Sequence, residues 1–223
     1  MSSPRPPIIA IDGLSASGKG TLAKRLAARL DFAFLDTGLL YRAAGMMAKE
    51  ACVPLDDMGA LAAFTQKLDM KALVARLDDP ALRGGGAAQA ASRVGPCAPL
   101  RSTLLKFQQD FAYNPPGGKK GAVLDGRDIG TVITPEAPVK IFVTASAEAR
   151  AMRRFKELQG RGEDVSESAV LADMRARDER DQTRATAPAK PAPDAIMLDT
   201  TNMNADEAFA AALAIVEERL KLS

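Results

Sequence analysis

The sequence contains no histidine, and this absence removes several kinds of chemistry. Without an imidazole the chain cannot build a Ser-His-Asp or Cys-His nucleophile, a histidine proton shuttle or a histidine-ligated zinc site. Any reaction must therefore use lysine, arginine, carboxylate and hydroxyl side chains. Phosphoryl transfer suits that set, because it depends on positioning and on stabilising charge more than on moving protons.

Cysteine and long apolar runs are also scarce. Cys52 and Cys97 are the only two thiols and are widely spaced, so reduced cysteines are expected rather than a disulfide or metal pair. No apolar run approaches the roughly 18 residues of a membrane helix, and residues 1–5 lack the apolar segment of a signal peptide. We therefore expect a cytoplasmic protein that does not bind membranes.

Net charge is small. The 30 basic and 28 acidic residues leave a formal charge of +2, too weak a bias to predict binding to DNA or RNA. The 223 residues suffice for a sizeable core in one or two domains. We expect the protein to be a monomer, and we expect its partners to be small-molecule nucleotides.

A glycine-bounded loop lies between an apolar run and a helical pattern. The run is residues 8–11, and leucines then recur every four residues at positions 22, 26 and 30. The loop itself reads Gly13-Leu14-Ser15-Ala16-Ser17-Gly18-Lys19-Gly20-Thr21. Such a loop turns its backbone N–H groups toward phosphate oxygens, the helix start adds a positive dipole end, and Lys19 can reach the outer phosphates. A glycine-rich turn that binds nothing is the alternative, but the flanking strand and helix favour an ATP site.

The residue after the loop lysine is unusual. The general phosphate-loop pattern has Ser or Thr there, whose hydroxyl ligates magnesium, whereas this chain has Gly20 and then Thr21. We therefore expect Mg²⁺ to be held mainly by nucleotide oxygens and water. The order Gly-Lys-Gly-Thr resembles that of nucleoside monophosphate kinases more than that of GTPases or motor ATPases.

Strand and helix patterns alternate along the chain. Together with 8–11, short apolar runs predict strands at 32–35, 122–124, 139–143 and 195–198. Helices are expected at about 19–30, 39–50, 56–67, 87–92, 99–111, 147–159, 167–180 and 205–220, the last with Asn204 as N-cap and Glu207 three residues on. This alternation predicts an α/β fold with a five-stranded parallel sheet and helices on both faces. Residues 70–86 are expected to form an irregular insert and residues 185–194 a proline-containing loop.

Polar residues follow two of the predicted strands. Asp125 comes at the carboxyl end of 122–124, where ligands bind in parallel sheets, and could hold magnesium through water; a solvated Asp-Gly turn is the alternative. After 32–35, a hydroxyl at Thr37 and a guanidinium at Arg42 could form a second phosphate site. For that pair, a simply capped helix start remains equally open.

Two arginine clusters follow the fourth strand. One combines Arg177, Arg180, Asp181 and Arg184, and the other Arg150, Arg153 and Arg154, both at helical spacing. A solvated basic face is the usual explanation. In a phosphate-binding chain we instead predict a lid that brings arginines onto a transferring phosphoryl group, and we assign Arg154 to the ATP site.

With these elements in place, the chain resembles the bacterial cytidylate kinases. The most specific strings are Asp125-Gly126-Arg127-Asp128-Ile129-Gly130-Thr131-Val132 and Arg177-Asp178-Glu179-Arg180-Asp181 with Arg184. Others are the Ile-Asp-Gly that leads into the loop, residues 35–38 with Tyr41-Arg42, Ala91-Ser92-Arg93-Val94, Arg101 and residues 138–142.

The resemblance implies transfer of the γ-phosphate of ATP to CMP or dCMP, giving CDP or dCDP. It places the acceptor phosphate on Thr37, Arg42, Arg127 and Arg184, the cytosine edge on Ser92, Arg101 and Asp128, and the ribose on Arg177 and Asp181, with Asp125 beside them. The catalytic set would be Lys19, Arg127, Arg177, Asp181 and Arg184.

One region departs from the family pattern, which usually has a small β-rich excursion before Ser92. Here the stretch is short and rich in glycine. We therefore expect one P-loop kinase over 1–223: a core of about 6–68, 99–150 and 192–223, a short NMP-binding insert at about 69–98, and an arginine-rich lid at about 151–191.

Two alternatives remain. One is a kinase of the same fold for AMP, UMP or a non-nucleotide. The other is a nucleotide-dependent switch protein, which would be expected to carry a guanine-reading Asn-Lys-x-Asp element that this sequence lacks.

Overall fold

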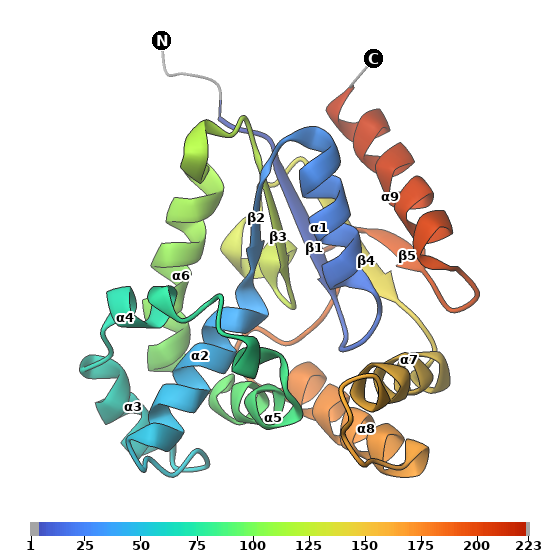
Figure 1. The fold of residues 1–223 in the computed structure, drawn as a ribbon. Coiled ribbons are helices and arrows are strands. Elements are labelled where there is room, and N and C mark those ends of the chain that lie inside the picture. The colour runs from blue at the N-terminus through green and yellow to red at the C-terminus, as the bar shows by residue number, and fades with distance from the viewer. Residues whose placement is uncertain (1–4, 222–223) are drawn as a thin grey trace. The chain divides into compact units, whose positions relative to one another are not determined.

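The computed structural model describes residues 5–221, which are organised around one five-stranded parallel sheet (Figure 1). The strand order is β2-β3-β1-β4-β5. The strands are β1 (Ile8–Gly13), β2 (Ala33–Asp36), β3 (Ala122–Gly126), β4 (Val139–Thr144) and β5 (Ile196–Asp199). Each contains or overlaps one of the predicted apolar runs, so the predicted α/β class and sheet are confirmed.

Strand β1 is the centre of the sheet and pairs in parallel with β3 and β4. Its Ile11 lies opposite Asp125, and Asp12 lies opposite both Gly126 and Phe142. Every position of β1 and β3 is buried, as expected for strands covered on both faces. Because the strands are parallel, the residues that follow their carboxyl ends gather at one edge of the sheet.

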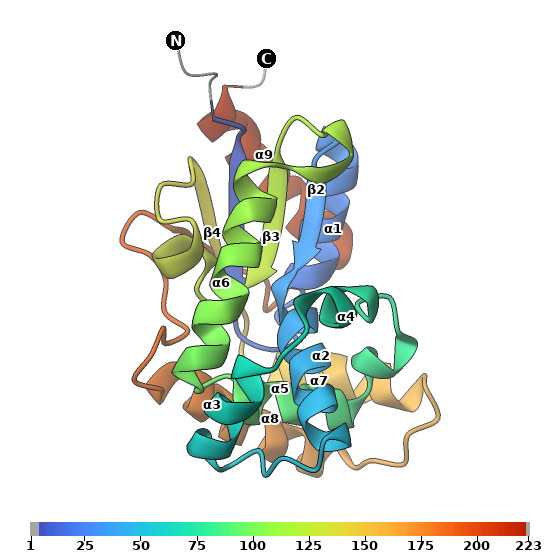
Figure 2. The same ribbon diagram turned by 90° about the vertical axis from the view of Figure 1, so that its left-hand side faces the viewer.

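Helical segments cover both faces, as predicted. Helices α1 (Lys19–Leu30) and α9 (Ala205–Leu220) pack together on one face, where Ile11, Leu26 and Val216 share the main apolar core (Figure 1). Successive side chains of a strand point to opposite faces, so Asp12 points away from this core. It points toward η3 (Ile129–Ile133), a single π-helical turn on the other face (Figure 2).

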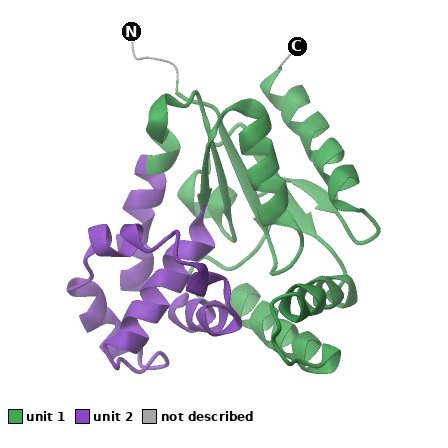
Figure 3. Ribbon diagram, in the orientation of Figure 1, with its two compact units in different colours: residues 1–35, 111–223 green, residues 36–110 purple. Residues whose placement is uncertain are grey.

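The described residues form two compact units (Figure 3). Residues 1–35 and 111–223 make the sheet unit, and residues 36–110 make the helical unit. The predicted insert lies wholly within the helical unit and the predicted lid wholly within the sheet unit. The helical unit contains α2 (Thr37–Glu50), α3 (Met58–Gln66), α4 (Met70–Ala75), η1 (Pro80–Arg83), α5 (Gly85–Val94) and most of α6 (Ala98–Tyr113).

The prediction of an irregular stretch at 70–86 is wrong. Asp69 caps α4 by accepting hydrogen bonds from the backbone N–H groups of Lys71 and Ala72, at 2.8 and 3.2 Å. Asp79 caps η1 in the same way. Apart from the last residue of β2, residues 36–110 contain no strand, in agreement with the expected short insert.

The sheet unit also contains η2 (Pro116–Gly118) and two helices in the predicted lid, α7 (Ala147–Gln159) and α8 (Glu167–Thr183). The lid helices share a small apolar core of their own, formed by Ala151, Leu158, Val170 and Met174. Residues 184–195 contain no helix or strand, so the predicted loop is confirmed.

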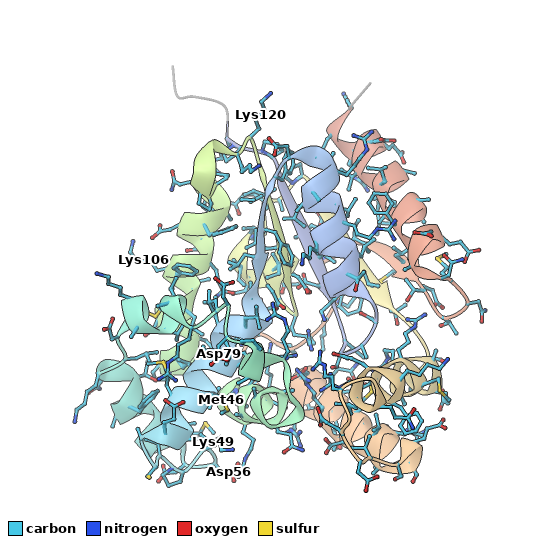
Figure 4. The ribbon with its side chains drawn as sticks, in the orientation of Figure 1. Met46, Lys49, Asp56, Asp79, Lys106 and Lys120 are labelled. Carbon is cyan, nitrogen blue, oxygen red and sulfur yellow. The ribbon has the colours of Figure 1, made fainter. Side chains whose placement is uncertain are left out.

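The helical unit has exposed ion pairs on its surface. Lys106 pairs with Asp110 along α6 at 3.5 Å, and Arg93 pairs with Asp56 (Figure 4). Such solvated pairs contribute little to stability, because water and salt screen them. Among residues 5–221, no helix has the length and apolar character needed to cross a membrane.

Candidate active site

The loop of residues 13–18 joins β1 to α1 at the carboxyl edge of the sheet. Gly13 has φ +152°, and a Cβ there would lie 2.2 Å from the carbonyl oxygen of Val143, so only glycine fits. Gly18, with φ +90°, precedes α1 and offers no side chain to cap the helix. The N–H groups of the first helical turn are thus presented to an anion, as the sequence predicts for a phosphate loop.

Lys19 and Asp125 meet beside this loop. The Lys19 Nζ lies 3.7 Å from Asp125 Oδ1 and 3.5 Å from the carbonyl oxygen of Leu14. Both side chains are largely buried, with 11% and 6% of their surface exposed. A Cβ at Gly20 would lie 3.0 Å from Asp125 Oδ2, so the carboxylate occupies the space that Ser or Thr takes in the general pattern. The structure therefore gives a physical reason for Gly20.

A cavity of about 570 Å³ opens on the α1 side of the loop. Residues 16–22 form one wall, and the turn after β5 forms another. The lining from outside the loop consists of Val143, Arg153, Glu157, Thr200, Met203, Asn204, Ala205 and Ala208. Its size is in the usual range for a small-molecule site.

Arg153, rather than Arg154, contributes to this lining. It donates to Thr200 Oγ1 at 3.1 Å and reaches the carbonyl oxygen of Ser17 at 3.5 Å, so it joins the loop to the turn after β5. Arg154, the residue assigned to ATP from the sequence, forms an ion pair at 2.8 Å with Glu157, which itself lines the cavity.

Buried charges connect η3 to the end of α8. Arg127 Nε donates to Asp181 Oδ2 at 3.0 Å, and Arg184 Nη2 lies 3.7 Å from Asp128 Oδ1. Arg177 Nη1 lies 3.2 Å from Ser15 Oγ in the phosphate loop. The structure thus brings together all five of these predicted residues in the sheet unit.

The charges in this group set each other's ionisation. Burial by itself would raise the pKa of Asp181, but the positive charges of Arg127, Arg177 and Arg184 outweigh it and hold that pKa below its usual range. Burial would likewise lower the pKa of Arg127, but Asp181 and Asp125 more than compensate and raise it. The Arg127 guanidinium therefore remains charged despite its burial.

Arg150 has a structural place in α7. It donates to Asp178 Oδ2 at 2.7 Å and reaches the carbonyl oxygen of Ser15 at 3.3 Å, with only 4% of its surface exposed. It therefore ties α7 to α8 and both to the phosphate loop. The predicted face of α8 holds only in part, because Arg180 is exposed whereas Asp178 and Asp181 are buried.

Four predicted site residues lie in the helical unit. Thr37, at the start of α2, and Ser92, on α5, are 3% and 6% exposed. Arg42 Nη1 donates to the carbonyl oxygen of Leu82 at 2.8 Å. Arg101 lies over the ring of Tyr41, 5.4 Å from its centroid. All four belong to α2, α5 or α6.

Sequence reasoning missed Thr200 and Asn204 as parts of the site, and it named Arg150 and Arg153 in a lid cluster without assigning them to the ATP site. For Thr200 a signal was available, because it directly follows β5 and the carboxyl-edge rule that selected Asp125 applies to it equally. The arginine spacing indicated that residues 150–154 share a helix face, but it could not indicate which of them is buried.

Comparison with known proteins identifies relatives over nearly the whole chain. A family model described as "Cytidylate kinase" matches residues 9–218. A protein named cytidylate kinase from Paramagnetospirillum magneticum is 56% identical over 212 residues, covering 94% of this chain and 97% of that protein. Those from Rhodospirillum rubrum and Caulobacter vibrioides are 56% and 49% identical, each over 95% of this chain and 98% and 95% of their own lengths.

Among solved structures, an uncharacterized protein from Eubacterium ventriosum superposes with a TM-score of 0.50 at 16% identity. The match covers 96% of this chain and 99% of that one. At this identity the likeness concerns the fold alone.

Proposed function

The chain belongs to the cytidylate kinase family, and on that premise we propose that it transfers the γ-phosphate of ATP to CMP or dCMP, giving CDP or dCDP. The observation that carries the proposal is the buried group of Arg127, Arg177, Arg184 and Asp181, which reaches the phosphate loop through Ser15. Positive side chains fixed beside a triphosphate site are what phosphoryl transfer requires.

ATP is held in this proposal by residues of the sheet unit. The N–H groups of residues 13–21 surround its phosphates, Lys19 contacts the outer phosphates, and Arg154 is assigned to ATP as well. The cavity beside the loop accommodates the rest of the nucleotide, with Arg153 and Thr200 at its rim. All of these groups lie in one unit, which supports ATP binding without any contribution from residues 36–110.

CMP is assigned to residues of both units. In the helical unit Thr37 and Arg42 hold the acceptor phosphate, while Ser92 and Arg101 contact cytosine. The sheet unit contributes Asp125, Arg127, Asp128, Arg177, Asp181 and Arg184. A carboxylate at Asp128 accepts from the exocyclic amine of cytosine, whereas uracil offers a carbonyl at that position, so the unmatched pairing disfavours UMP.

The chemistry follows from these positions. An oxygen of the CMP phosphate attacks the γ-phosphorus of ATP, and the new P–O bond forms as the bond to the β,γ-bridging oxygen breaks, so ADP leaves. Lys19 and the arginines stabilise the negative charge spread over the transferring group. The lid residues 151–191 keep water from the same phosphorus.

Magnesium fits the residues present. Mg²⁺ binds through one or two carboxylates, several waters and substrate phosphates, and Asp125 places one buried carboxylate beside the phosphate loop. When bound with ATP, the ion would neutralise charge on the phosphate oxygens. Asp125 would hold it through water, since no cluster of three or more potential ligands occurs among residues 5–221.

An acceptor panel tests the proposal. Purified protein with ATP and Mg²⁺ is assayed with CMP, dCMP, UMP, AMP and a hydroxylated sugar, and Lys19→Met is run alongside to reveal contaminating kinases. We expect CMP and dCMP to be phosphorylated well above the other acceptors. Preferred transfer to AMP, UMP or the sugar would overturn the proposal in favour of another kinase of this fold, and acceptor-independent hydrolysis would favour a switch protein.

A further inference from the structure

The turn η3 is anchored by a side chain from outside its own segment. A helical turn begins with backbone N–H groups that have no partner inside the turn, and the residue at its start usually accepts them with its own side chain. Here that residue is Asp128, yet its carboxylate makes no capping bond. Its Oδ1 lies instead near the Arg184 guanidinium.

The capping carboxylate comes from β1. Asp12 Oδ1 accepts from the N–H of Ile129 and Asp12 Oδ2 from the N–H of Gly130, both at 2.8 Å. Asp12 is only 4% exposed and lies 117 residues before Ile129 in the sequence. Strand β1 is the central strand of the sheet and is buried at every position, so this carboxylate is held by the core of the sheet unit.

Burial disfavours the charged form of the Asp12 carboxylate, and the two backbone N–H groups offset part of that cost. Asp125 and Asp128 repel its charge, and the N–H groups of Ile129 and Gly130 attract it. A Cβ at Gly130 would lie 3.1 Å from Lys140 Cδ, a tight contact, and 3.5 Å from Asp12 Oδ2, an ordinary one, so glycine here chiefly leaves room for the Lys140 side chain.

We propose that Asp12 is a positioning residue for acceptor selection: by capping η3 from β1, it fixes Arg127 and Asp128 where the acceptor is recognised. This inference rests on the proposed function for its substrate, although the anchoring itself does not.

The test compares wild type with Asp12→Asn, which keeps the shape but directs an N–H₂ group at one of the two backbone donors. We expect KM for CMP to rise by about tenfold and the CMP-to-UMP ratio of kcat/KM to fall, since a lost buried hydrogen bond frees the turn. KM for ATP should stay within about twofold, because the phosphate loop holds ATP. Asp128→Asn is measured alongside, because it changes the side chain assigned to cytosine itself and so shows the effect of losing base recognition directly.

Asp57→Asn is the matched control. The Asp57 carboxylate also accepts from two backbone N–H groups, of Gly59 and Ala60, but it caps α3, which carries no assigned site residue. This variant should leave both KM values unchanged. If Asp12→Asn raises KM for CMP and KM for ATP by the same factor, or changes neither value, Asp12 is a structural residue only.

Hydrogen exchange tests the anchoring itself, whatever the acceptor. In Asp12→Asn the amides of Ile129 and Gly130 should exchange faster than in wild type, and unchanged exchange would overturn the proposal even if the protein is a CMP kinase. If Asp12→Asn does not fold, Asp12→Glu decides, because it keeps a carboxylate but displaces it by one methylene group, and it should raise KM for CMP alone. If the wild-type protein binds no CMP, but the amides of Ile129 and Gly130 lose protection in Asp12→Asn, the assignment of CMP as acceptor is refuted and the anchoring of η3 by Asp12 stands.

Discussion

At the scale of single residues, Lys19 combines a predicted role with an environment that only the structure supplies. Its Nζ lies beside the buried Asp125 carboxylate, so it is pre-positioned at the phosphate loop. Lys19→Met keeps most of the stem and removes the charge. We expect kcat to fall by about 10² or more, because the charge acts on the transferring phosphoryl group. Steady-state kinetics with a melting curve checks this, and near-normal turnover would refute the loop assignment.

Asp12 gives a prediction for pH. Its burial, with smaller contributions from Asp128 and Asp125, raises its pKa to about 7 in spite of the N–H groups of Gly130 and Ile129. The folded protein therefore holds this proton more tightly than the unfolded chain, whose Asp titrates near pH 4. The resulting stabilisation is complete below about pH 4 and is lost as pH rises through about 7.

Urea unfolding of wild type and Asp12→Asn from pH 4.5 to 8 measures this effect, with the limits set by the two pKa values. The free energy of unfolding of wild type, relative to the variant, should fall as pH rises through this window and level off above about pH 7. A flat difference would show that folding leaves the pKa of Asp12 unchanged, and a difference that rises with pH would show that folding lowers it; either result would contradict the prediction.

At the scale of elements, two arginines join α7 to α8 in different surroundings. Arg150 and Asp178 are paired at 2.7 Å with 5% and 11% of their side chains exposed, whereas Arg175 and Glu148 are paired at 3.1 Å with 62% and 67% exposed. Arg150→Ala leaves a buried carboxylate without its cation and should lower stability by about 3 kcal/mol.

Arg175→Ala is the matched control, since it breaks a solvated pair between the same two helices. Its loss of stability should be much smaller than that of Arg150→Ala, because water and salt screen the pair. Chemical unfolding of both variants compares them directly. Equal losses would mean that burial of the Arg150 pair contributes nothing, and that the lid helices depend on their apolar core instead.

The elements also show where sequence reasoning succeeds and fails. Apolar runs and helical spacing located all five strands and the long helices, because these depend on local pattern. The short α4 and η1 were missed, although Asp69 and Asp79 are recognisable caps, because Pro80 and the triplet at residues 84–86 suggested a break. In fact Gly84 precedes α5 and the next two glycines lie inside it.

The site was predictable only in its parts. Motif strings named Arg127, Asp128 and Arg177, and the structure brings them together in the sheet unit. The contacts that position them, from Asp12 to Ile129 and from Ser15 to Arg177, join residues more than 100 positions apart. No local pattern encodes such pairs, because they arise from the packing of strands and helices that are distant in sequence.

At the scale of the whole molecule, the two nucleotides make different demands on the two compact units. The groups assigned to ATP all lie in the sheet unit, whereas those assigned to CMP are divided between the sheet unit and residues 36–110. A ligand that contacts both units must restrict their relative placement, while a ligand of one unit need not. We therefore expect CMP, alone or with ATP, to narrow the distribution of distances between the units more than ATP alone.

Energy transfer between dyes measures this distribution. Cys52 is exposed in the helical unit and Cys97 is buried, so dyes attach at Cys52 and at Glu218→Cys on the exposed side of α9. The control pair, Lys120→Cys with Glu218→Cys in a Cys52→Ser background, lies wholly in the sheet unit and should not respond (Figure 4 marks Lys120). Saturation is verified by calorimetry on the same preparation. If ATP alone narrows the distribution as much as CMP does, or if bound CMP leaves it unchanged, the acceptor is not held by both units, and the assignment of Thr37, Arg42, Ser92 and Arg101 to CMP fails.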